Sequence, residues 1–522
     1  NYIILKAPKG NYYIQVSSVG FANGKSANFD LGESAYNVPD IKLAAASQAI
    51  ETVTVRGQAP MVQNKDGKLI LNVENSTLAA GSNALEVVKR APGVSVDKDD
   101  NLQLMGQQGV TVTIDGRQTF MTGEQLATFL KSTDAAQIKS VEVTTTRQAK
   151  DDAEGAVGTI NIVLKKNNTE GFNGSFVASA AQGKHFRGNS SVNLNYKKNN
   201  TTVFGSYAYT DNKSETELNL ERTIANNGKS TVFDQQGGLI EREKNHNDRF
   251  GVEQKTSSKN PMLLQFTGNN NEEDGDNLSA SYIGPSLNVT DSIMRANSYS
   301  LAKFNRYSAN FNNEYKIDTT GSKLTFDFDW SMFRTKSDVD YFYTTENPVG
   351  GLLRPEERER SSMPVDIDIY VSKLDYVKPF KKGKLEAGLK YSNVKSDNDL
   401  GFERFVGGQW EDYEGRPNHF VYTEQVSAGY VDYSTEFGKW TAKAGVRAEY
   451  TISDGHSITK DSRVKRDYLD FFPSANLGYN ISPNHILTLS YARKISRPNY
   501  RFLNPFRYYI DKLTFQEGNP YV

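Results

Sequence analysis

The stretch Leu324-Thr325-Phe326-Asp327-Phe328-Asp329-Trp330-Ser331-Met332 decides the fold. Its even positions are apolar and its odd positions are polar, which is the period of a β-strand with two unlike faces. A strand that crosses a membrane in a barrel needs this contrast, because one face meets lipid and the other meets a polar lumen. Asp327 and Asp329 are therefore predicted to point into the lumen.

Residues 440–450 repeat the pattern, with Trp440 and Tyr450 at the two ends of a stripe of small apolar residues. Aromatic residues at both ends of a lipid-facing stripe are typical of the two aromatic girdles of an outer-membrane barrel. The alternation then predicts that Lys443, Arg447 and Glu449 face the lumen.

The composition agrees with many such strands. The 522 residues are only 37% hydrophobic, yet they include 28 Tyr, 27 Phe and 41 Gly. A net charge of −1 argues against a general nucleic-acid binder, and the absence of cysteine excludes disulfides and thiolate metal sites. No apolar run approaches the roughly 18 residues of a membrane helix. On composition alone, a large soluble β-protein or a β-solenoid also fits.

From Phe172 onward the chain alternates short turns with long polar stretches. The short turns are predicted at 197–200, 379–384, 436–439 and 482–484. The long polar stretches 211–250, 333–365 and 396–420 are predicted as loops. Short turns at one end and long loops at the other are the outer-membrane arrangement. At about 25 residues per strand with its share of turn and loop, the segment has room for roughly 14 strands.

The first third of the chain is organised differently. A strand over Asn11–Val16 predicts that residues 1–46 are the C-terminal part of a small β-domain. Residues 47–68 are predicted as a linker, 69–166 as a compact α/β unit and 167–522 as the barrel. In the α/β unit, Ser82 is expected to cap a helix that ends at Pro92-Gly93, and Asp115-Gly116 is expected to form a turn.

The linker contains the β-prone run Glu51-Thr52-Val53-Thr54-Val55, which stands alone between polar, Gly and Pro residues. It is either a strand that joins two domains or an exposed strand that pairs with a partner chain. The residues themselves leave both interpretations open.

Ordered motifs run nearly the whole length of the chain. They are Gly10-Asn11-Tyr12-Tyr13 to Gly20-Phe21, Glu51 to Val55, Ala91-Pro92-Gly93-Val94, Val112 to Arg117, Ile138 to Val143, Glu154 to Ile162, Tyr491 to Pro498, Leu503-Asn504-Pro505 and Gly518-Asn519-Pro520. In this order they resemble the TonB-dependent outer-membrane receptors, and most closely the Bacteroidetes-type members with a carboxypeptidase-regulatory-like domain before the plug.

The resemblance implies active import of a ligand across the outer membrane, with TonB pairing to Glu51, Thr52, Val53, Thr54 and Val55 as the TonB box. It makes residues 69–166 the plug of a barrel of the 22-strand class. The shortfall in strand number and the missing closing strand predict a C-terminal truncation, and the marginal size of the first small β-domain predicts an N-terminal one. The motif residues of the plug are Pro92, Gly93, Asp115, Gly116, Arg117, Glu142, Arg147, Glu154, Gly155 and Asn161.

The resemblance also leaves alternatives and partners open. A plugged-barrel signal transducer, an importer of glycans or peptides paired with a surface lipoprotein, and a surface adhesin or structural barrel all fit the same architecture. The expected partners are TonB, outer-membrane lipid and an imported ligand that the sequence does not identify. No nucleic acid, cofactor or metal is expected.

Candidate chemistry elsewhere is weak. The five histidines are scattered, so no enzyme is expected, and Asp97 to Asn101 lacks the glycine that a calcium loop needs at its sixth position. Arg117, Glu142, Arg147 and Glu154 could pair with lumen charges or lie solvated on the plug surface. Aromatic residues in the long loops are candidates for ligand contact or for the interfacial belt. They are Tyr341, Tyr343, Trp410, Tyr413, Phe420 and Tyr422.

Overall fold

The computed structural model divides the chain into two compact units, Asn1–Pro60 and Met61–Val522. The residues that it describes are 7–17, 24–43, 60–65, 68–74, 76–79, 82–97, 101–119, 123–133, 135–145, 148–154, 157–165, 169–226, 229–482, 485–495, 497, 507–511 and 514–518.

The first unit contains two short antiparallel pairs. Strand β1 (Gly10–Tyr12) pairs with β4 (Phe29–Leu31), and β2 (Gln15–Val16) pairs with β3 (Gly24–Lys25). The single strand predicted over residues 11–16 is thus two strands with different partners.

The second unit begins with an α/β domain, called the plug below. Its six-stranded sheet has the order β10-β9-β12-β11-β6-β5, in which only β12 and β9 run parallel. Its elements are β5 (Val62–Lys65), β6 (Lys68–Asn72), η1 (Thr77–Ala79), α1 (Ala84–Lys89), β7 (Val94–Val96), β8 (Leu102–Leu104), β9 (Thr111–Ile114), β10 (Arg117–Gln118), α2 (Gly123–Ser132), η2 (Ala135–Gln137), β11 (Ile138–Thr144) and β12 (Thr159–Leu164).

The plug sheet starts before the predicted boundary at residue 69. Strand β5 lies in the segment predicted as linker and pairs with β6 from Val62↔Leu71 to Lys65↔Lys68. Pairing decides the boundary, because the polar sequence of β5 has no alternation that would mark it as a strand.

Helix α1 packs its predicted apolar face into the plug core, where Leu85, Val87 and Val88 are buried. Its N-cap is Asn83, not the predicted Ser82. The Asn83 side chain accepts a hydrogen bond from the backbone N–H of Glu86 at 2.9 Å. Asn and Ser are comparable N-caps, so the sequence could not decide between neighbouring candidates.

The predicted turn between β9 and β10 is confirmed. Asp115 and Gly116 have φ values of 50° and 80°, and two consecutive positive φ values favour Asp-Gly in a tight hairpin. The Asp115 carboxylate also accepts a hydrogen bond from the backbone N–H of Leu164 at 2.9 Å, which ties the turn to β12.

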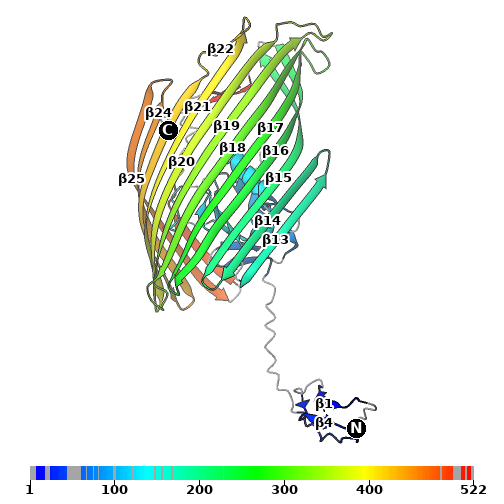
Figure 1. The fold of residues 1–522 in the computed structure, drawn as a ribbon. Coiled ribbons are helices and arrows are strands. Elements are labelled where there is room, and N and C mark those ends of the chain that lie inside the picture. The colour runs from blue at the N-terminus through cyan, green and yellow to red at the C-terminus, as the bar shows by residue number, and fades with distance from the viewer. Residues whose placement is uncertain are drawn as a thin grey trace. The chain divides into compact units, whose positions relative to one another are not determined.

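The rest of the second unit is one 14-stranded antiparallel sheet, as the estimate of roughly 14 strands anticipated. Figure 1 shows its strands side by side and tilted, with plug elements behind them. The strands are β13 (Gly171–Gln182), β14 (Phe186–Lys198), β15 (Thr201–Asn226), β16 (Lys229–Ser257), β17 (Asn260–Gly284), β18 (Ser292–Lys316), β19 (Lys323–Glu346), β20 (Glu357–Phe380), β21 (Gly383–Val406), β22 (Gln409–Asp412), β23 (Asn418–Phe437), β24 (Trp440–Ser457), β25 (Ser462–Ser482) and β26 (His485–Ala492).

Neighbouring strands follow chain order, except that β22 pairs only with β21. Among the described residues, the first strand β13 and the last strand β26 do not pair with each other, so the sheet is an open barrel wall. A separate hairpin joins β27 (Arg507–Asp511) and β28 (Thr514–Glu517).

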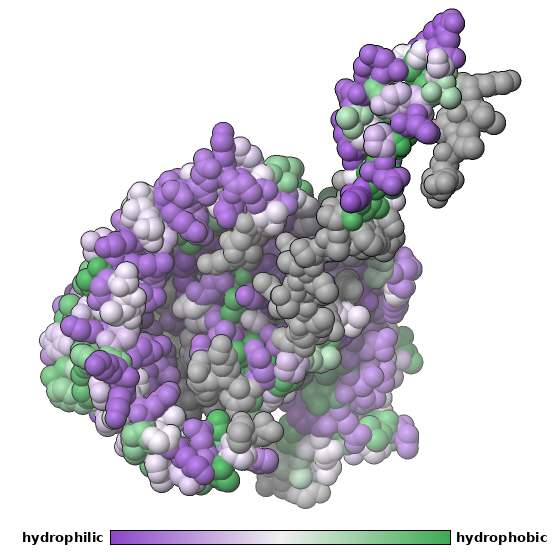
Figure 2. Space-filling view, turned by 90° about the horizontal axis from the view of Figure 1, so that it is seen from below, coloured by the Kyte–Doolittle hydropathy of each residue, from purple (hydrophilic) through white to green (hydrophobic). Residues whose placement is uncertain are grey.

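The two faces of the wall are those that the alternation predicts. In β19, Phe326 and Phe328 are exposed on the outer face, whereas Phe333 is 1% exposed and packs with the plug core. The Asp327 carboxylate lies 3.9 Å from the guanidinium of Arg117 in the plug. Figure 2, seen from below, shows hydrophobic residues in patches along the outer rim.

The predicted long loops are wrong. Most of residues 211–250, 333–365 and 396–420 lie in strands, and β15 and β16 are 26 and 29 residues long where about 9–11 residues cross a membrane. Hairpin pairing satisfies their backbone hydrogen bonds, so polar side chains can occupy both faces beyond the apolar band. One example is the ion pair of Asp211 and Arg242 at 2.8 Å.

The predicted short turns are confirmed where they are described. Strand β14 ends at Lys198 and β15 begins at Thr201, and equally short connections join β20 to β21 and β23 to β24. Within the described part of the chain, no helix is long and apolar enough to span a membrane.

Candidate functional site

One short segment of the plug, residues 148–154, makes a dense group of polar contacts with the wall and is called the anchor segment below. The plug also contacts the wall through the apolar side chain of Phe333 and through the pairs of Asp115 with Arg249 and of Arg117 with Asp327. The anchor segment has no regular secondary structure and lies against the lumen faces of β21, β23 and β24. The contacts are charged or involve backbone N–H groups. This makes the anchor segment the candidate site for holding and releasing the plug.

Asp152 is the central acid of the anchor segment. It forms an ion pair with Arg447 of β24 at 2.9 Å and a second with Lys390 of β21. Burial alone would raise the pKa of Asp152, but the two cations outweigh it and hold the pKa well below its usual range. Asp152 is therefore ionised, and its charge depends on both strands of the wall.

Arg447 is the central cation of this network. It is 1% exposed, and its Nε donates to Glu449 at 2.5 Å while Nη2 donates to Asp152. Glu449 in turn accepts the backbone N–H of Ala153 at 3.2 Å. A buried arginine between two carboxylates is expensive to separate, since each group left alone would be a desolvated charge.

A second group of contacts holds the start of the anchor segment. The Asp432 carboxylate of β23 accepts the backbone N–H groups of Ala149 and Lys150 at 3.4 and 3.1 Å. Lys443 of β24 donates to the Gln148 side chain at 2.6 Å and to Glu386 at 3.1 Å. These bonds fix the backbone of the segment, not only its side chains.

The chain after β26 reaches the end of the anchor segment. The backbone N–H of Ile495 donates to the Ala153 carbonyl at 3.1 Å, and Ile495 forms an isolated parallel bridge with Glu154. Arg497 donates to Glu449 at 2.6 Å and lies 3.7 Å from Glu154. Plug and wall thus share one continuous network of charges.

Glu154 is the titratable member of this network at neutral pH. Burial and the neighbouring Glu424 carboxylate raise the pKa of Glu154 to about 7, although Arg497 opposes the shift. Half of its side chain, 51%, remains exposed, so the free energy of its charging is moderated by solvent.

The opposite side of the plug meets β15 to β19 through a cavity of about 120 Å³. Plug residues such as Thr119 and Phe129 line one side, and Arg249 and Arg306 lie on the wall side. Arg306 is 8% exposed, and its Nη1 donates to Thr267 at 3.3 Å. Its Nε has no hydrogen-bond partner among the described residues, and it has no carboxylate partner there within 4.0 Å.

The predicted motif residues of the plug have several roles. Asn161 accepts hydrogen bonds from the Thr113 hydroxyl at 2.9 Å and the Gly116 N–H at 2.8 Å, so it braces the β9–β10 turn. Glu142 pairs with Lys68 of β6 at 2.9 Å, inside the plug. Four charged plug residues were predicted to pair with the wall. Arg117 lies 3.9 Å from Asp327, and Glu154 lies 3.7 Å from Arg497. Glu142 pairs inside the plug, and Arg147 lies outside the described residues.

Helix α1 ends at Lys89, shortly before Pro92 and Gly93. Gly93 has a φ of 76°, and a Cβ added there would lie 2.7 Å from Cε of Met105, so the position favours glycine. The predicted residues Glu51, Thr52, Val53, Thr54, Val55, Arg147 and Gly155 lie outside the described residues.

The six aromatic candidates do not form one cluster. Tyr341 stacks on Tyr343 and on Phe402, with centroids 6.3 and 6.0 Å apart, and Tyr413 packs edge-on against Phe402. Arg416 lies 4.2 Å from the Tyr413 ring centroid and pairs with Glu359 at 3.1 Å.

The other three candidates lie apart from this group. Trp410 packs against Phe405 on the β21–β22 hairpin, below the guanidinium of Arg360 at 4.4 Å. Phe420 and Tyr422 on β23 are 2% and 9% exposed. Phe420 and Tyr422 are two residues apart on one strand, so they share a face and pack together as a small buried cluster.

Sequence reasoning placed Lys443, Arg447 and Glu449 on the lumen face, and each is found there in contact with the plug. It missed Asp152 and Asp432. Asp432 follows the alternation of β23 and could have been found from it. Asp152 lies in an irregular segment, where no period exists to identify it.

The described residues contain no group of three or more His, Asp or Glu side chains placed to hold a metal ion. The charged groups of the anchor network pair with one another, although Nη1 of Arg447 has no hydrogen-bond partner among the described residues. The arrangement can hold, release and re-form a contact between plug and wall.

Comparison with known proteins supports the barrel. Residues 315–522 match the outer membrane protein beta-barrel family. This segment is therefore an outer-membrane β-barrel, and the match places it in the outer membrane. A search of curated protein sequences finds no match.

Solved structures of similar architecture include the ferric-catecholate import receptor Fiu of E. coli K12 (10% identity, TM-score 0.34, 83% of this chain and 85% of that chain). Others are the alcaligin outer membrane receptor FauA of Bordetella pertussis (12%, 0.32, 83% and 81%) and the siderophore receptor PiuA of Acinetobacter baumannii (10%, 0.34, 83% and 92%).

Proposed function

We propose that this chain imports a ligand across the outer membrane, and that TonB opens it by pulling on Glu51 to Val55. The observation that carries the proposal is a folded plug held against the lumen face of an outer-membrane wall by the charged network of the anchor segment. The outer membrane has no ATP, so the energy that breaks such contacts must come from elsewhere. The sequence motifs that resemble those of TonB-dependent receptors indicate TonB as its source.

The topology of the plug determines the order in which a pulling force would separate its strands. The proposed TonB box precedes β5, which is an edge strand of the plug sheet and, among the described residues, pairs with β6 alone. Force along the chain would separate the four residue pairs of β5 first and those of β6 next. An edge strand can be removed stepwise, with few hydrogen bonds broken at a time, whereas the anchor segment resists as one unit.

The finer features of the proposal follow the resemblance. Residues 1–46 would be the end of a carboxypeptidase-regulatory-like domain of a Bacteroidetes-type receptor, 47–68 the linker, 69–166 the plug and 167–522 the barrel. Tyr341, Tyr343 and Tyr413 would contact the ligand from the end of the barrel with long strands. A surface lipoprotein partner is the corresponding proposal for a glycan or peptide ligand.

Val53→Pro tests the partner directly. Strand addition uses backbone hydrogen bonds, and proline removes the N–H donor. The full chain should bind the periplasmic domain of TonB in a pull-down, and Val53→Pro should abolish binding. Thr54→Ala, which keeps its N–H, is the control and should bind as the unchanged chain does. Equal binding by all three would refute the TonB-box assignment.

Deleting residues 50–56 in cells separates import from adhesion. Uptake from a panel of ferric chelates, haem, cobalamin, peptides and oligosaccharides should stop for the ligand that the intact chain imports, while binding of that ligand to the cell surface persists. A surface adhesin would show no uptake in either case.

A further inference from the structure

The cavity of about 120 Å³ between the plug and β15 to β19 has a polar floor that the strand register assembles. On the lumen face, Ser206 of β15 lies opposite Arg249 of β16, which in turn lies opposite Thr267 of β17. Thr267 lies opposite Ser308 of β18, and Ser308 lies opposite Ser331 of β19. Directly opposed residues of paired strands stand side by side on one face of a sheet. Four hydroxyl groups and one guanidinium group therefore form a row across five strands.

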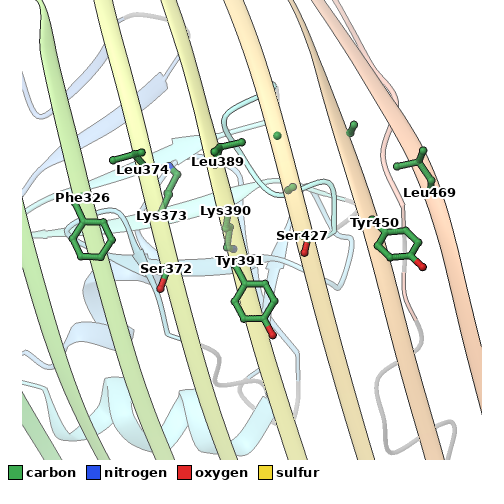
Figure 3. A pocket seen from close by; sticks show the side chains of 13 residues that line it. Phe326, Ser372, Lys373, Leu374, Leu389, Lys390, Tyr391, Ser427, Tyr450 and Leu469 are labelled. Atoms are coloured by element: carbon green, nitrogen blue, oxygen red, sulfur yellow. The ribbon is translucent and has the colours of Figure 1, made fainter.

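The alternation of the wall determines which charged residues face this cavity. Figure 3 shows the alternation on the anchor side, where Leu389 and Tyr391 stand on the outer face and Lys390 between them lies behind its strand. On β16 the same alternation places Arg249 on the lumen face and Asp248 on the outer face. Asp248 is exposed there, so its carboxylate points away from the cavity.

Two arginines of the wall border the cavity, and their guanidinium groups are only partly hydrogen-bonded. Arg306 of β18 is 8% exposed, and its Nη1 donates to Thr267 at 3.3 Å. Nη2 of Arg249 donates to Gln265 at 2.8 Å and lies 3.9 Å from Asp115. The Nε of each arginine is buried and has no hydrogen-bond partner in the part of the chain that the structure describes. A buried donor that lacks an acceptor costs about 1–3 kcal/mol, so an acceptor inside the cavity would be favoured.

The carboxylates around the cavity leave these donors available. Asp115 and Asp327 each lie 3.9 Å from an arginine. Asp329 lines the cavity and accepts a hydrogen bond from Asn310 at 2.7 Å. None of these three carboxylates lies within 4.0 Å of Arg306. The cavity thus combines several N–H and O–H donors with one carboxylate, a set that suits an anion carrying a proton of its own.

We propose that this cavity binds one inorganic phosphate ion between the plug and the wall. Phosphate oxygens would accept from the Nε groups of Arg249 and Arg306 and from the hydroxyl row, and guanidinium groups are well suited to bind phosphate. The P–OH group would donate to Asp329. Sulfate carries no proton at neutral pH, so it would meet that carboxylate as a second negative charge. The volume is well above the about 10–15 Å³ that one water needs, and it is far too small for a metal chelate or an oligosaccharide.

The complete site requires the plug in its place. Thr119 and Phe129 of the plug form the side of the cavity that faces the arginines. A ligand that binds one state of an equilibrium stabilises that state, so phosphate would stabilise the plugged barrel. It would do so on the side where the charged pairs between plug and wall are 3.9 Å long. The site involves neither TonB nor an imported ligand, so it stands or falls separately from the proposed import.

Equilibrium dialysis of the full chain in detergent tests the proposal, with radiolabelled inorganic phosphate as the probe in a buffer free of other oxyanions. We expect one phosphate bound per chain, and competition by sulfate at least tenfold weaker than by unlabelled phosphate. Arg306→Met should weaken binding at least tenfold. Arg334→Met is the matched control. It removes an arginine from the neighbouring strand that pairs with Asp368 at 3.0 Å outside the cavity, so it should bind phosphate as the unchanged chain does.

Trypsin cleavage of the plug in increasing urea guards against a folding defect. Without phosphate, Arg306→Met should be at least as resistant as the unchanged chain. Added phosphate should shift cleavage of the unchanged chain and of Arg334→Met to higher urea, and it should leave Arg306→Met unshifted. Ser308→Ala removes one hydroxyl and no charge, and it should weaken phosphate binding severalfold. A chain that binds no phosphate, equal binding by Arg306→Met, or equal competition by sulfate would contradict the proposal.

Discussion

The plug contacts the wall on two sides, and the two sides use buried arginines in opposite ways. On the side of β21 to β24, Arg447 lies between Asp152 and Glu449. On the side of β15 to β19, Arg306 borders a cavity, and none of the described carboxylates lies within 4.0 Å of it. Both arginines are buried in the same sheet. The comparison teaches that the shorter charged contacts between plug and wall lie at the anchor segment, since the Asp115–Arg249 and Arg117–Asp327 pairs of the other side are 3.9 Å long.

Arg447→Met should have the largest effect. It leaves Asp152 and Glu449 without a shared cation, and breaking a buried pair by removing one partner costs about 3–5 kcal/mol. Trypsin cleavage of the plug in increasing urea should shift to markedly lower urea concentration. Lys465→Met is the control, since Lys465 is 65% exposed and lies 3.7 Å from Asp454, and it should change little. An unchanged urea profile of trypsin cleavage for Arg447→Met would show that the anchor segment does not hold the plug.

Arg306→Met should have a much smaller effect, in the opposite direction. Methionine fills similar space without a buried charge, and replacing such a charge by an apolar side chain is often neutral or stabilising, here by up to about 1 kcal/mol. The same urea series measures it. A loss as large as that of Arg447→Met would show that the cavity side also anchors the plug, and the contrast between the two sides would fail.

Glu154→Gln should have the smallest effect, and one that depends on pH. The pKa of Glu154 in the folded chain is about 7, against an ordinary value of 4.5. A raised pKa means that the folded state holds the proton more tightly, so the stabilisation is present below about pH 4.5 and is lost as pH rises to about 7.

The measurement compares trypsin protection of the two chains at pH 5 and pH 8. The unchanged chain should lose protection relative to Glu154→Gln as pH rises, and the two should agree most closely at low pH. A constant difference across the range would show that Glu154 does not titrate within the network.

Much of the architecture follows from local sequence. The period of two in β19 and β24 assigns lumen and lipid faces, and it assigns Arg447 and Glu449 to the lumen face, where they contact the plug. The Asp115-Gly116 turn and the buried face of α1 are also local properties, because backbone φ preferences and helical spacing act over a few residues.

The extent of the strands and the identity of the anchor were decided by the tertiary structure. The stretch 211–217 contains no apolar residue, and it forms a strand because neighbouring strands satisfy its backbone hydrogen bonds. Asp152 lies in an irregular segment and meets Arg447, which is 295 residues away in the sequence. Local sequence determines which way a side chain points, whereas the partner of a buried charge is set by the folded chain as a whole.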